Sequence, residues 1–583
     1  MRSNGLGWGW LLAISSIAMA VGCKPARETP SSGANEEAAK DVAENVARQP
    51  GATPGVWFRD VAADRGLVAS HAGKAAESYF FPASMSPGAA WIDYDRDGDL
   101  DALVAVGAGD WPSRVRLFQQ DDQHRFRDAT DEAGLRVKCE VQGFAVGDVD
   151  NDGYDDLLIT AYRGDRLLKN QRGSRFEDIT ESSGIGRHGW STSAAFFDFD
   201  RDGRLDLFVC QYVDYDPTRP CFGANGRQDF CNPAMFERTP DRLYRNMSDE
   251  SGVKFEDHSE RSGIAHERGA GLGVVCGDFN GDQWPDIYVA NDGHANFLWI
   301  NQRDGAFRDE AVPLGAAYDL VGRGQGSMGV AAEDVNHDGA LDLFATNLDG
   351  ESNALYLSDS QGGFVESSAL AQVARPSYAF TGFGTTFLDV ENDGDLDLVV
   401  ANGRVRRQAN VTLVASSFWD DYAERSHLYL NDGTGKFALA AGDADPLLSK
   451  PAVLRGLAAG DFDADGRVDL LVSAVEGPVR LYRNSTTQVA NWVSLKLVDP
   501  RRGGRVAIGA SVELQTQGRL VRRQATTCGS YLSAHDGRVH LGLGKVDKVE
   551  AVVVTWPEGE REQFDLPVLN RVVVLERGTG RTP

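Results

Sequence analysis

The chain has 583 residues, of which 42% are hydrophobic and 25% are charged, and its formal net charge is −27. This length is too great for one ordinary hydrophobic core, so we expect two ordered domains. The strong negative charge argues against nucleic acid as a partner.

Residues 1–23 have the pattern of an export signal. The apolar stretch from Leu11 to Val21 is too short to span a bilayer. It ends in Ala20-Val21-Gly22-Cys23, which resembles a bacterial lipobox with Cys23 as the lipidated residue; ordinary cleavage after Ala20 is the alternative. Residues 24–55 are rich in Pro, Ser, Ala, Glu and Gly and predict a disordered linker. We therefore expect an exported protein, which is either a membrane-anchored lipoprotein of the periplasm or cell surface, or is secreted.

One acidic loop then occurs seven times. Each copy reads D-x-[D/N/E]-x-D at positions 1, 3 and 5 and has Asp again at position 9, so four side chains offer oxygen to one hard cation. Glycine at position 6 allows a sharp turn, after which position 7 offers its backbone carbonyl. We predict up to seven Ca²⁺ ions, with the fourth loop weakest because it has Gln283 at position 6. The expected ligands at positions 1, 3, 5, 7 and 9 are Asp93, Asp95, Asp97, Asp99 and Asp101; Asp148, Asp150, Asp152, Tyr154 and Asp156; Asp198, Asp200, Asp202, Arg204 and Asp206; Asp278, Asn280, Asp282, Trp284 and Asp286; Asp334, Asn336, Asp338, Ala340 and Asp342; Asp389, Glu391, Asp393, Asp395 and Asp397; and Asp461, Asp463, Asp465, Arg467 and Asp469.

The residues that flank these loops exclude an EF-hand. An EF-hand loop is closed by glutamate at position 12 and lies between helices. Here position 12 is Val104, Ile159, Val209, Val289, Ala345, Val400 or Val472. Each loop is preceded by a short run of small residues, such as GFAV before the second loop, and is followed by a short apolar run rich in β-branched residues. These runs predict strands, so each ion would tie a β-hairpin.

The repeat is longer than the loop. Loop starts are 55, 50, 80, 56, 55 and 72 residues apart, which suggests propeller blades with two insertions. Each period also contains an aromatic strand and a strand that opens with Phe, and the first such strand, Phe58 to Val61, precedes the first loop. It can complete the last blade, which lacks one. We therefore predict an all-β chain with a seven-bladed calcium-binding β-propeller over residues 56–484, followed by a small β-rich, sandwich-like domain over residues 485–583.

The repeats resemble the FG-GAP or VCBS repeats of the calcium-bearing propellers in integrin α-subunits. RVAIGASVEL from Arg505, SYLSAHDGRVHLGLG from Ser530 and VVVTWPEGE from Val552 are similar to the ASPIC/UnbV module. Together they resemble the cartilage acidic protein family over about Val56 to Glu576. No cysteine-rich EGF-like module follows, so we expect a bacterial-type lipoprotein member. The resemblance implies an extracellular calcium-binding protein with a role in adhesion or interaction.

Two insertions, Gln211 to Pro240 and Gly403 to Ser426, follow second strands, so they should lie on the face opposite the calcium loops. We expect a partner to bind there. The alternative is that the Asn and Asp residues only cap strands and turns. Aromatic residues of the second insertion, among them Phe418 and Trp419, form either an exposed contact or a local core. The expected partner-face residues are Tyr212, Asp214, Tyr215, Asp216, Asn291, Asp292, Asn347, Asn402 and Arg404.

The chain has seven cysteines, of which six would remain after lipidation of Cys23, and export would place them in an oxidising compartment. Cys221 and Cys231 lie ten residues apart in the first insertion and predict a disulfide. Cys210 and Cys276 lie in apolar runs and are expected to be buried thiols. Cys139 and Cys528 have no role that the sequence assigns.

Signals for catalysis are weak. Gly324 to Gly329 matches G-x-G-x-x-G but leads into a strand, and the ten histidines form no zinc motif. His535 and His540 are expected to be structural. We expect a non-enzymatic, calcium-stabilised module that binds protein or carbohydrate outside the cytoplasm and touches the membrane only through its lipid. The alternatives are a polysaccharide-processing enzyme on a calcium propeller scaffold and a biosynthetic accessory protein.

Overall fold

The computed structural model describes residues 56–583 apart from 73–78, 108–113, 187–188, 224–225, 360–361, 408–416, 488–489, 517–518 and 567. The expected signal, Cys23 and the linker lie outside the described residues. Among the residues described, no helix is long and apolar enough to cross a membrane. Helices are short: α3 (Phe81–Met85), α4 (Thr180–Ser183), α5 (Ala311–Leu314), α6 (Ala374–Ser377) and α7 (Pro446–Ser449), with 3-10 turns η1 (Pro233–Met235), η2 (Ile264–His266), η3 (Phe418–Tyr422) and η4 (Pro500–Arg502).

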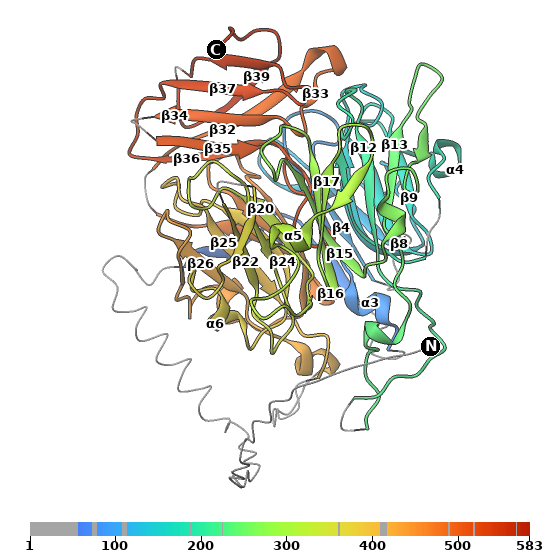
Figure 1. Cartoon of the computed structure of the whole chain (residues 1–583). Helices are drawn as coiled ribbons and strands as arrows, with labels where there is room; N and C mark the ends of the chain where they lie inside the picture. Colours follow the sequence, from blue (N-terminus) through green and yellow to red (C-terminus); the bar gives the residue numbers. More distant parts are fainter. Residues whose placement is uncertain are drawn as a thin grey trace, which may run out of the picture. The chain divides into compact units, whose positions relative to one another are not determined.

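Seven antiparallel sheets, each built on four strands, occupy the described part of the chain up to Asn484 (Figure 1). In every sheet the metal-loop candidate joins the first strand to the second. Numbered in chain order and written from first to fourth strand, sheets 1 to 7 are β3 (Ala89–Ile92), β4 (Asp101–Ala105), β5 (Val115–Gln120), β6 (Phe126–Asp128); β7 (Glu140–Gly147), β8 (Asp156–Tyr162), β9 (Arg166–Asn170), β10 (Phe176–Asp178); β11 (Ser191–Phe197), β12 (Asp206–Gln211), β13 (Arg242–Asn246), β14 (Phe255–Asp257); β15 (Gly271–Gly277), β16 (Asp286–His294), β17 (Phe297–Asn301), β18 (Phe307–Asp309); β20 (Val330–Glu333), β21 (Asp342–Ala345), β22 (Ala354–Ser358), β23 (Phe364–Glu366); β24 (Gly382–Leu388), β25 (Asp397–Asn402), β26 (His427–Asn431), β27 (Phe437–Leu439); and β28 (Leu454–Gly460), β29 (Asp469–Ala474), β31 (Arg480–Asn484), β1 (Phe58–Asp60). Two short pieces supplement them: β19 (Gln325–Gly326) pairs with β16, and β2 (Ser70–Ala72) pairs with β30 (Glu476–Pro478).

The sheets close into a ring. Their first strands contact one another in cyclic order, from β3 through β7, β11, β15, β20 and β24 to β28, and β28 contacts β3. Strand β1 pairs with β31, with Phe58 opposite Asn484, as the offset of the Phe-led strands predicts. Pairing of the two ends of the repeat region removes the open edge that a linear stack would leave.

The C-terminal strands form two further sheets. One contains β33 (Arg505–Val506), β32 (Asn491–Asp499), β36 (Val539–Gly544) and β39 (Val572–Glu576); the other contains β35 (Arg519–Gln524), β34 (Ser511–Thr516), β37 (Ala551–Thr555) and β38 (Arg561–Phe564). A single hydrophobic cluster, which includes Leu495, Leu514 and Val552, joins the two sheets. This part of the chain is therefore a small β-sandwich.

Between β35 and β36 the chain leaves the sandwich and enters the centre of the ring. We call Thr526 to Asp536 the central segment. It contacts the first strand of every sheet: Trp91 N donates to Ala534 O (3.1 Å), Thr527 Oγ1 to Val146 O (3.0 Å), Leu532 N to Ser193 Oγ (2.9 Å), Cys276 N to Cys528 Sγ (3.4 Å), Val330 N to Ser530 O (3.0 Å), Thr385 N to Ser530 Oγ (3.1 Å) and Ala459 N to His535 Nδ1 (2.9 Å). The ring is thus filled by the chain's own C-terminal domain.

Small residues on the first strands make room for this segment. A Cβ added at Gly143 would lie 2.5 Å from Leu532 O and 2.7 Å from Leu532 Cα. Tyr531 is fully buried, its ring centre lies 4.9 Å from that of Phe383, and its hydroxyl donates to Met85 O. Crowding at the axis therefore comes from a distant part of the chain as well as from the neighbouring strands.

Candidate metal centre

The first aspartate of each loop holds the turn. In loop 2, Asp148 Oδ1 accepts from Asp152 N (3.2 Å) and Oδ2 accepts from Gly153 N (2.8 Å). The same two bonds recur in loops 3 to 7, whereas in loop 1 Gly98 N donates to Asp93 Oδ1 (3.3 Å). Gly153 has φ +91°, and Gln283 takes the same left-handed turn at φ +71°. The fourth loop keeps the conformation at a steric cost.

The last aspartate of each loop is a structural residue in all seven repeats. In loop 2, Asp156 Oδ2 accepts from Val149 N (2.9 Å) and Oδ1 accepts from Asn170 N (2.7 Å), at the end of the third strand. Asp101, Asp206, Asp286, Asp342, Asp397 and Asp469 make the equivalent pair of bonds. Each of these aspartates therefore ties its loop to the end of the third strand of the same sheet.

Four loops bring three carboxylates together. Within each group the oxygen atoms lie within 4.8 Å of one another, and the groups are Asp93, Asp95 and Asp97; Asp148, Asp150 and Asp156; Asp198, Asp200 and Asp206; and Asp461, Asp463 and Asp465. Oδ1 of Asp95, Asp150 and Asp463 is buried and receives no hydrogen bond in the described part of the chain. A buried acceptor without a donor is costly, and a cation would satisfy it. The all-oxygen donor set suits a hard cation.

Burial disfavours the charged form of these carboxyls. It raises the pKa of Asp148, Asp198, Asp389 and Asp461 to about 7. It raises the pKa of the position 9 carboxyls Asp156 and Asp397 well above the ordinary range, with neighbouring carboxylates adding to the effect. A bound cation would remove this cost by neutralising the cluster.

Basic side chains reach several loops, which the sequence did not reveal. Lys169 contacts Asp150, and Arg245 Nη2 lies 2.6 Å from Asp200 Oδ2. Arg483 Nε lies 2.6 Å from Asp463 Oδ2. All three bases stand one residue before the end of the third strand. The recurring K-N or R-N pair at that place is the signal that could have identified them.

The amide at the end of the third strand links successive loops. Asn170 Nδ2 donates to Tyr94 O (2.8 Å), which belongs to the loop of the preceding sheet. Asn246, Asn301, Asn431 and Asn484 make the equivalent bond to Val149, Phe199, Val335 and Val390, and Gln120 Nε2 donates to Phe462 O (3.1 Å) across the closure. Sheet 5 has Ser358 at this position. Sequence reasoning found these strands but not this role.

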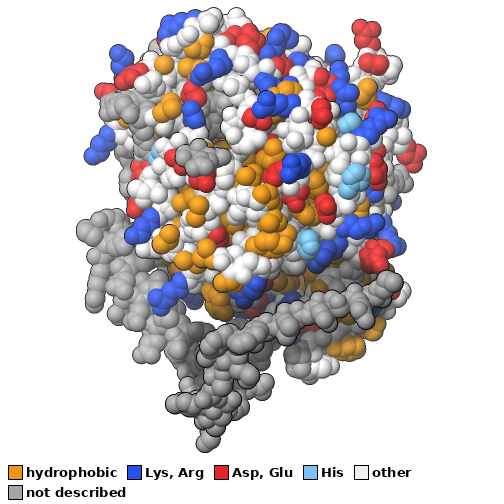
Figure 2. All heavy atoms as spheres, in the orientation of Figure 1, with side chains coloured by type: hydrophobic (Ala, Val, Ile, Leu, Met, Phe, Trp, Pro, Cys, Tyr) orange, Lys and Arg blue, Asp and Glu red, His pale blue; other side chains and the backbone are white. Residues whose placement is uncertain are grey.

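The sandwich covers the loop face with basic side chains. Lys496 Nζ lies 3.1 Å from Asp93 Oδ2, and Arg538 Nη2 donates to Asp461 O (3.0 Å). Arg505 Nη1 donates to Asp148 O (3.4 Å), and Arg522 Nη1 to Gly339 O (2.6 Å). His540 Nε2 contacts Asn392 Oδ1 (2.7 Å), and burial lowers its pKa to about 4, so it is neutral and structural there. The acidic charge is thus partly enclosed, and Figure 2 shows acidic and basic side chains interspersed on the visible face.

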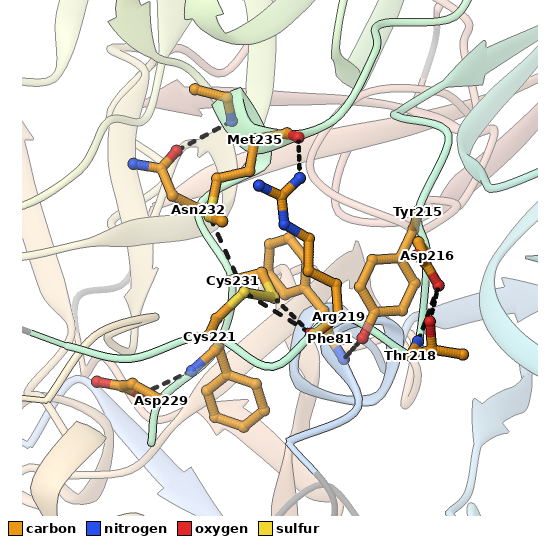
Figure 3. The surroundings of a disulfide bond; sticks show 12 residues. Phe81, Tyr215, Asp216, Thr218, Arg219, Cys221, Asp229, Cys231, Asn232 and Met235 are labelled. Atoms are coloured by element: carbon orange, nitrogen blue, oxygen red, sulfur yellow. Dashed lines mark hydrogen bonds between the residues drawn. A yellow bond between two sulfur atoms is a disulfide. The ribbon is translucent and has the colours of Figure 1, made fainter. Parts of the chain in front are cut away.

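The disulfide between Cys221 and Cys231 is present, as predicted (Figure 3). It lies in an aromatic cluster that contains α3 and both insertions, including Phe230 and Trp419. Phe81 N donates to the hydroxyl of Tyr215 (3.3 Å). The insertions therefore form a core of their own, which is the second of the two alternatives for the aromatic residues.

The expected partner face needs correction. Tyr212, Tyr215, Asn291, Asn347 and Asn402 are buried, so they are not surface contacts. The Asn side chains satisfy nearby backbone, as when Asn347 Nδ2 donates to Ser352 O (2.7 Å), and the tyrosines pack against Trp190. Asp214 and Asp216 are exposed, while Asp292 and Arg404 are half-buried. Burial by aromatic residues of the insertions is the physical reason for the difference.

The remaining cysteines are free thiols among the described residues. Cys210 and Cys276 are buried, as expected. Cys528 belongs to the central segment and is buried against Cys276. Burial raises the pKa of Cys139 to about 11, so this thiol stays protonated at neutral pH.

The matches to known protein families fall in two parts of the chain, the repeat region and the C-terminal part. The FG-GAP-like repeat model matches residues 93–159, 148–209, 278–345 and 334–400, and the ASPIC and UnbV model matches residues 500–582. The chain is 27% identical to cartilage acidic protein 1 of Homo sapiens over 506 residues, covering 82% of this chain and 70% of the relative. The same protein of Xenopus tropicalis is 27% identical over 505 residues, covering 82% and 71%.

Two solved lectins are similar to the chain in fold alone. One is an Agrocybe aegerita lectin that recognises non-reducing terminal N-acetylglucosamine, with a TM-score of 0.36, 14% identity and coverage of 61% of this chain and 80% of the lectin. The other is the BP39L lectin from Burkholderia pseudomallei, with a TM-score of 0.39, 12% identity and coverage of 69% and 97%.

Proposed function

We propose that this chain, which carries FG-GAP-like repeats followed by an ASPIC and UnbV domain, is an exported binding module stabilised by calcium ions. The observation that carries the calcium proposal is that Asp95, Asp150 and Asp463 each have a buried carboxylate oxygen that receives no hydrogen bond from the residues the structure describes. These side chains offer only oxygen atoms as metal ligands. Ca²⁺ is the cation that takes six to eight oxygen ligands in flexible geometry. Calcium at millimolar concentration outside the cytoplasm suits such sites.

The loops serve the ring, and a partner binds elsewhere. Six loops contact the sandwich or its basic side chains, including loop 1 through Lys496 and loop 7 through Arg538. Because the sandwich covers these loops, a large protein or carbohydrate has poor access to them. We assign the partner to the opposite face, where Asp214 and Asp216 remain exposed. The partner is a protein or a carbohydrate. Lipidation at Cys23 would hold the module at a membrane.

A glycan array and a protein pull-down, each run with 2 mM Ca²⁺ and with chelator, test the binding role. We expect capture of a ligand by the wild type and by a variant altered on the loop face, such as Arg522→Ala. Asp214→Ala with Asp216→Ala should weaken capture at equal folded content. If no protein or glycan is captured in either condition, or if capture survives the double substitution unchanged, the proposed face is wrong.

The calcium proposal has a separate test in loop 2. Asp150→Asn should remove one calcium equivalent, measured by metal analysis after dialysis. Asp121→Asn, which changes an exposed carboxylate outside the loops, is the control and should retain the wild-type calcium content. Equal calcium content in the wild type and in Asp150→Asn would count against loop 2 as a site.

A further inference from the structure

A cavity of about 660 Å³ lies where β1 closes sheet 7. Five arginines line it, namely Arg59 from β1, Arg65 from the following turn, Arg125 before β6, Arg467 from loop 7 and Arg483 from β31. Asp64 is the one carboxylate among the ten lining residues. Positive charge therefore gathers here in a chain whose formal net charge is −27.

Loop 7 holds three of these arginines in place. Arg483 Nε lies 2.6 Å from Asp463 Oδ2, and Arg467 contacts Asp465. Arg65 Nη2 lies 4.0 Å from Asp463 Oδ2, and its guanidinium lies 5.7 Å from the centre of the Phe462 ring. Guanidinium groups fixed in this way lose little conformational entropy when they bind an anion.

The other two arginines are available to a ligand. Arg59 and Arg125 are exposed, and neither makes an ion pair within the described part of the chain. Among the lining residues the five arginines outnumber the single carboxylate of Asp64, so the cavity suits an anionic group.

We propose that the cavity binds a sulfate or phosphate ester. Guanidinium groups bind tetrahedral oxyanions through paired N–H donors, which makes arginine the preferred residue for such groups. The volume falls within the ordinary range for small-molecule sites and exceeds the need of a free ion. The ligand is therefore an ester on a group of about sugar size. Because β1 and β31 both contribute, the site exists only when the ring is closed.

Calcium at loop 7 should strengthen this site, and this part rests on the proposed function. A calcium ion bound among the carboxylates of loop 7 would offset the negative charge of Asp463 and Asp465 behind the arginines. The ester would then meet a more positive cavity, and by linkage the ester would tighten calcium binding by the same factor. If calcium does not bind, ester binding remains but is the same with and without chelator.

Calorimetric titration of the full chain at constant ionic strength tests the proposal. The probes are inorganic sulfate, inorganic phosphate, a sulfated disaccharide, a phosphorylated disaccharide and the unsubstituted disaccharide. We expect binding of at least one ester, no binding of the unsubstituted sugar, and a loss of about tenfold in affinity for Arg59→Ala with Arg125→Ala. A preference for the sulfated or the phosphorylated sugar identifies the source of the group.

A matched control removes the same charge elsewhere. Arg375→Ala with Arg425→Ala takes two exposed arginines from other parts of the ring and should change affinity less than twofold. Melting temperatures report whether either double variant remains folded. Equal losses in the two double variants would indicate nonspecific attraction and overturn the site, as would a wild type that binds none of the esters.

Discussion

At the scale of single residues, the aspartates of one loop have different tasks. Asp156 has both carboxylate oxygens bonded to backbone amides, whereas Asp150 has a buried oxygen without a donor and a contact with Lys169. The repeat pattern gave these two residues the same expected role as ligands. Only the three-dimensional contacts show that Asp156, which belongs to the carboxylate group, also fastens its loop, whereas Asp150 has one oxygen that no hydrogen bond from the described residues satisfies.

Substitution in loop 2 should reveal this division. Asp156→Asn leaves a single oxygen for two buried amides, so it should destabilise the protein by about 1–3 kcal/mol with or without calcium. Asp150→Asn should lower stability only when calcium is present. Urea unfolding in calcium and in chelator measures both variants. A stability loss in Asp156→Asn that disappears in chelator would contradict the structural role.

Asp165 predicts a dependence on pH. It is buried just before β9, where it accepts from Ala161 N (2.8 Å) and from Ser191 Oγ (2.6 Å), and burial raises its pKa to about 7. Asn296 and Asn353 occupy the same position in sheets 4 and 5 and accept equivalent bonds from Asn291 N and Asn347 N. An asparagine therefore fits this place without a charge.

The folded protein holds the Asp165 proton more tightly than the unfolded chain, whose ordinary Asp pKa is about 4. The stability from this group is thus complete below pH 4 and is lost as pH rises through about 7. We expect Asp165→Asn to be more stable than the wild type at pH 8 and about equal to it near pH 4. Thermal unfolding between pH 4 and pH 8 measures this difference in stability. An Asp165→Asn variant that is no more stable than the wild type at pH 8 would refute the raised pKa of Asp165.

At the scale of elements, the strands and their pairing follow from the sequence, whereas the central segment does not. Short apolar runs, turn residues and the displaced Phe-led strand are local signals, so the sheets and the pairing of β1 with β31 could be predicted. The segment from Thr526 to Asp536 lies far along the chain from the strands it contacts. The small residues of those strands can be read from the sequence, but they could not show which segment packs against them.

Gly143 provides a test of the central segment. Gly143→Ala places a methyl group against the backbone of Leu532, so we expect a destabilisation of about 1–3 kcal/mol from overpacking. Gly189→Ala is the control, because a Cβ there meets no atom of the described residues within 4 Å. Thermal unfolding compares the two. Equal melting temperatures for both variants would mean that the segment does not occupy the ring in solution.

At the scale of the whole molecule, the ring, its loops and the sandwich form one structure. Side-chain amides join loops of neighbouring sheets, Gln120 continues the chain of bonds across the closure, and sandwich residues such as Arg505 and Arg538 lie over the acidic loops. Which face the sandwich covers could not be deduced, because it depends on the path of the central segment.

Calcium removal tests the central claim most directly. Each site at 100 times its dissociation constant would contribute about 2.7 kcal/mol, so several sites should dominate the stability of the ring. We expect the purified full chain to carry several calcium equivalents, to melt at a much lower temperature in chelator, and to recover with added Ca²⁺ but not with Mg²⁺. A chain that carries no calcium and has the same melting temperature in chelator would contradict the account.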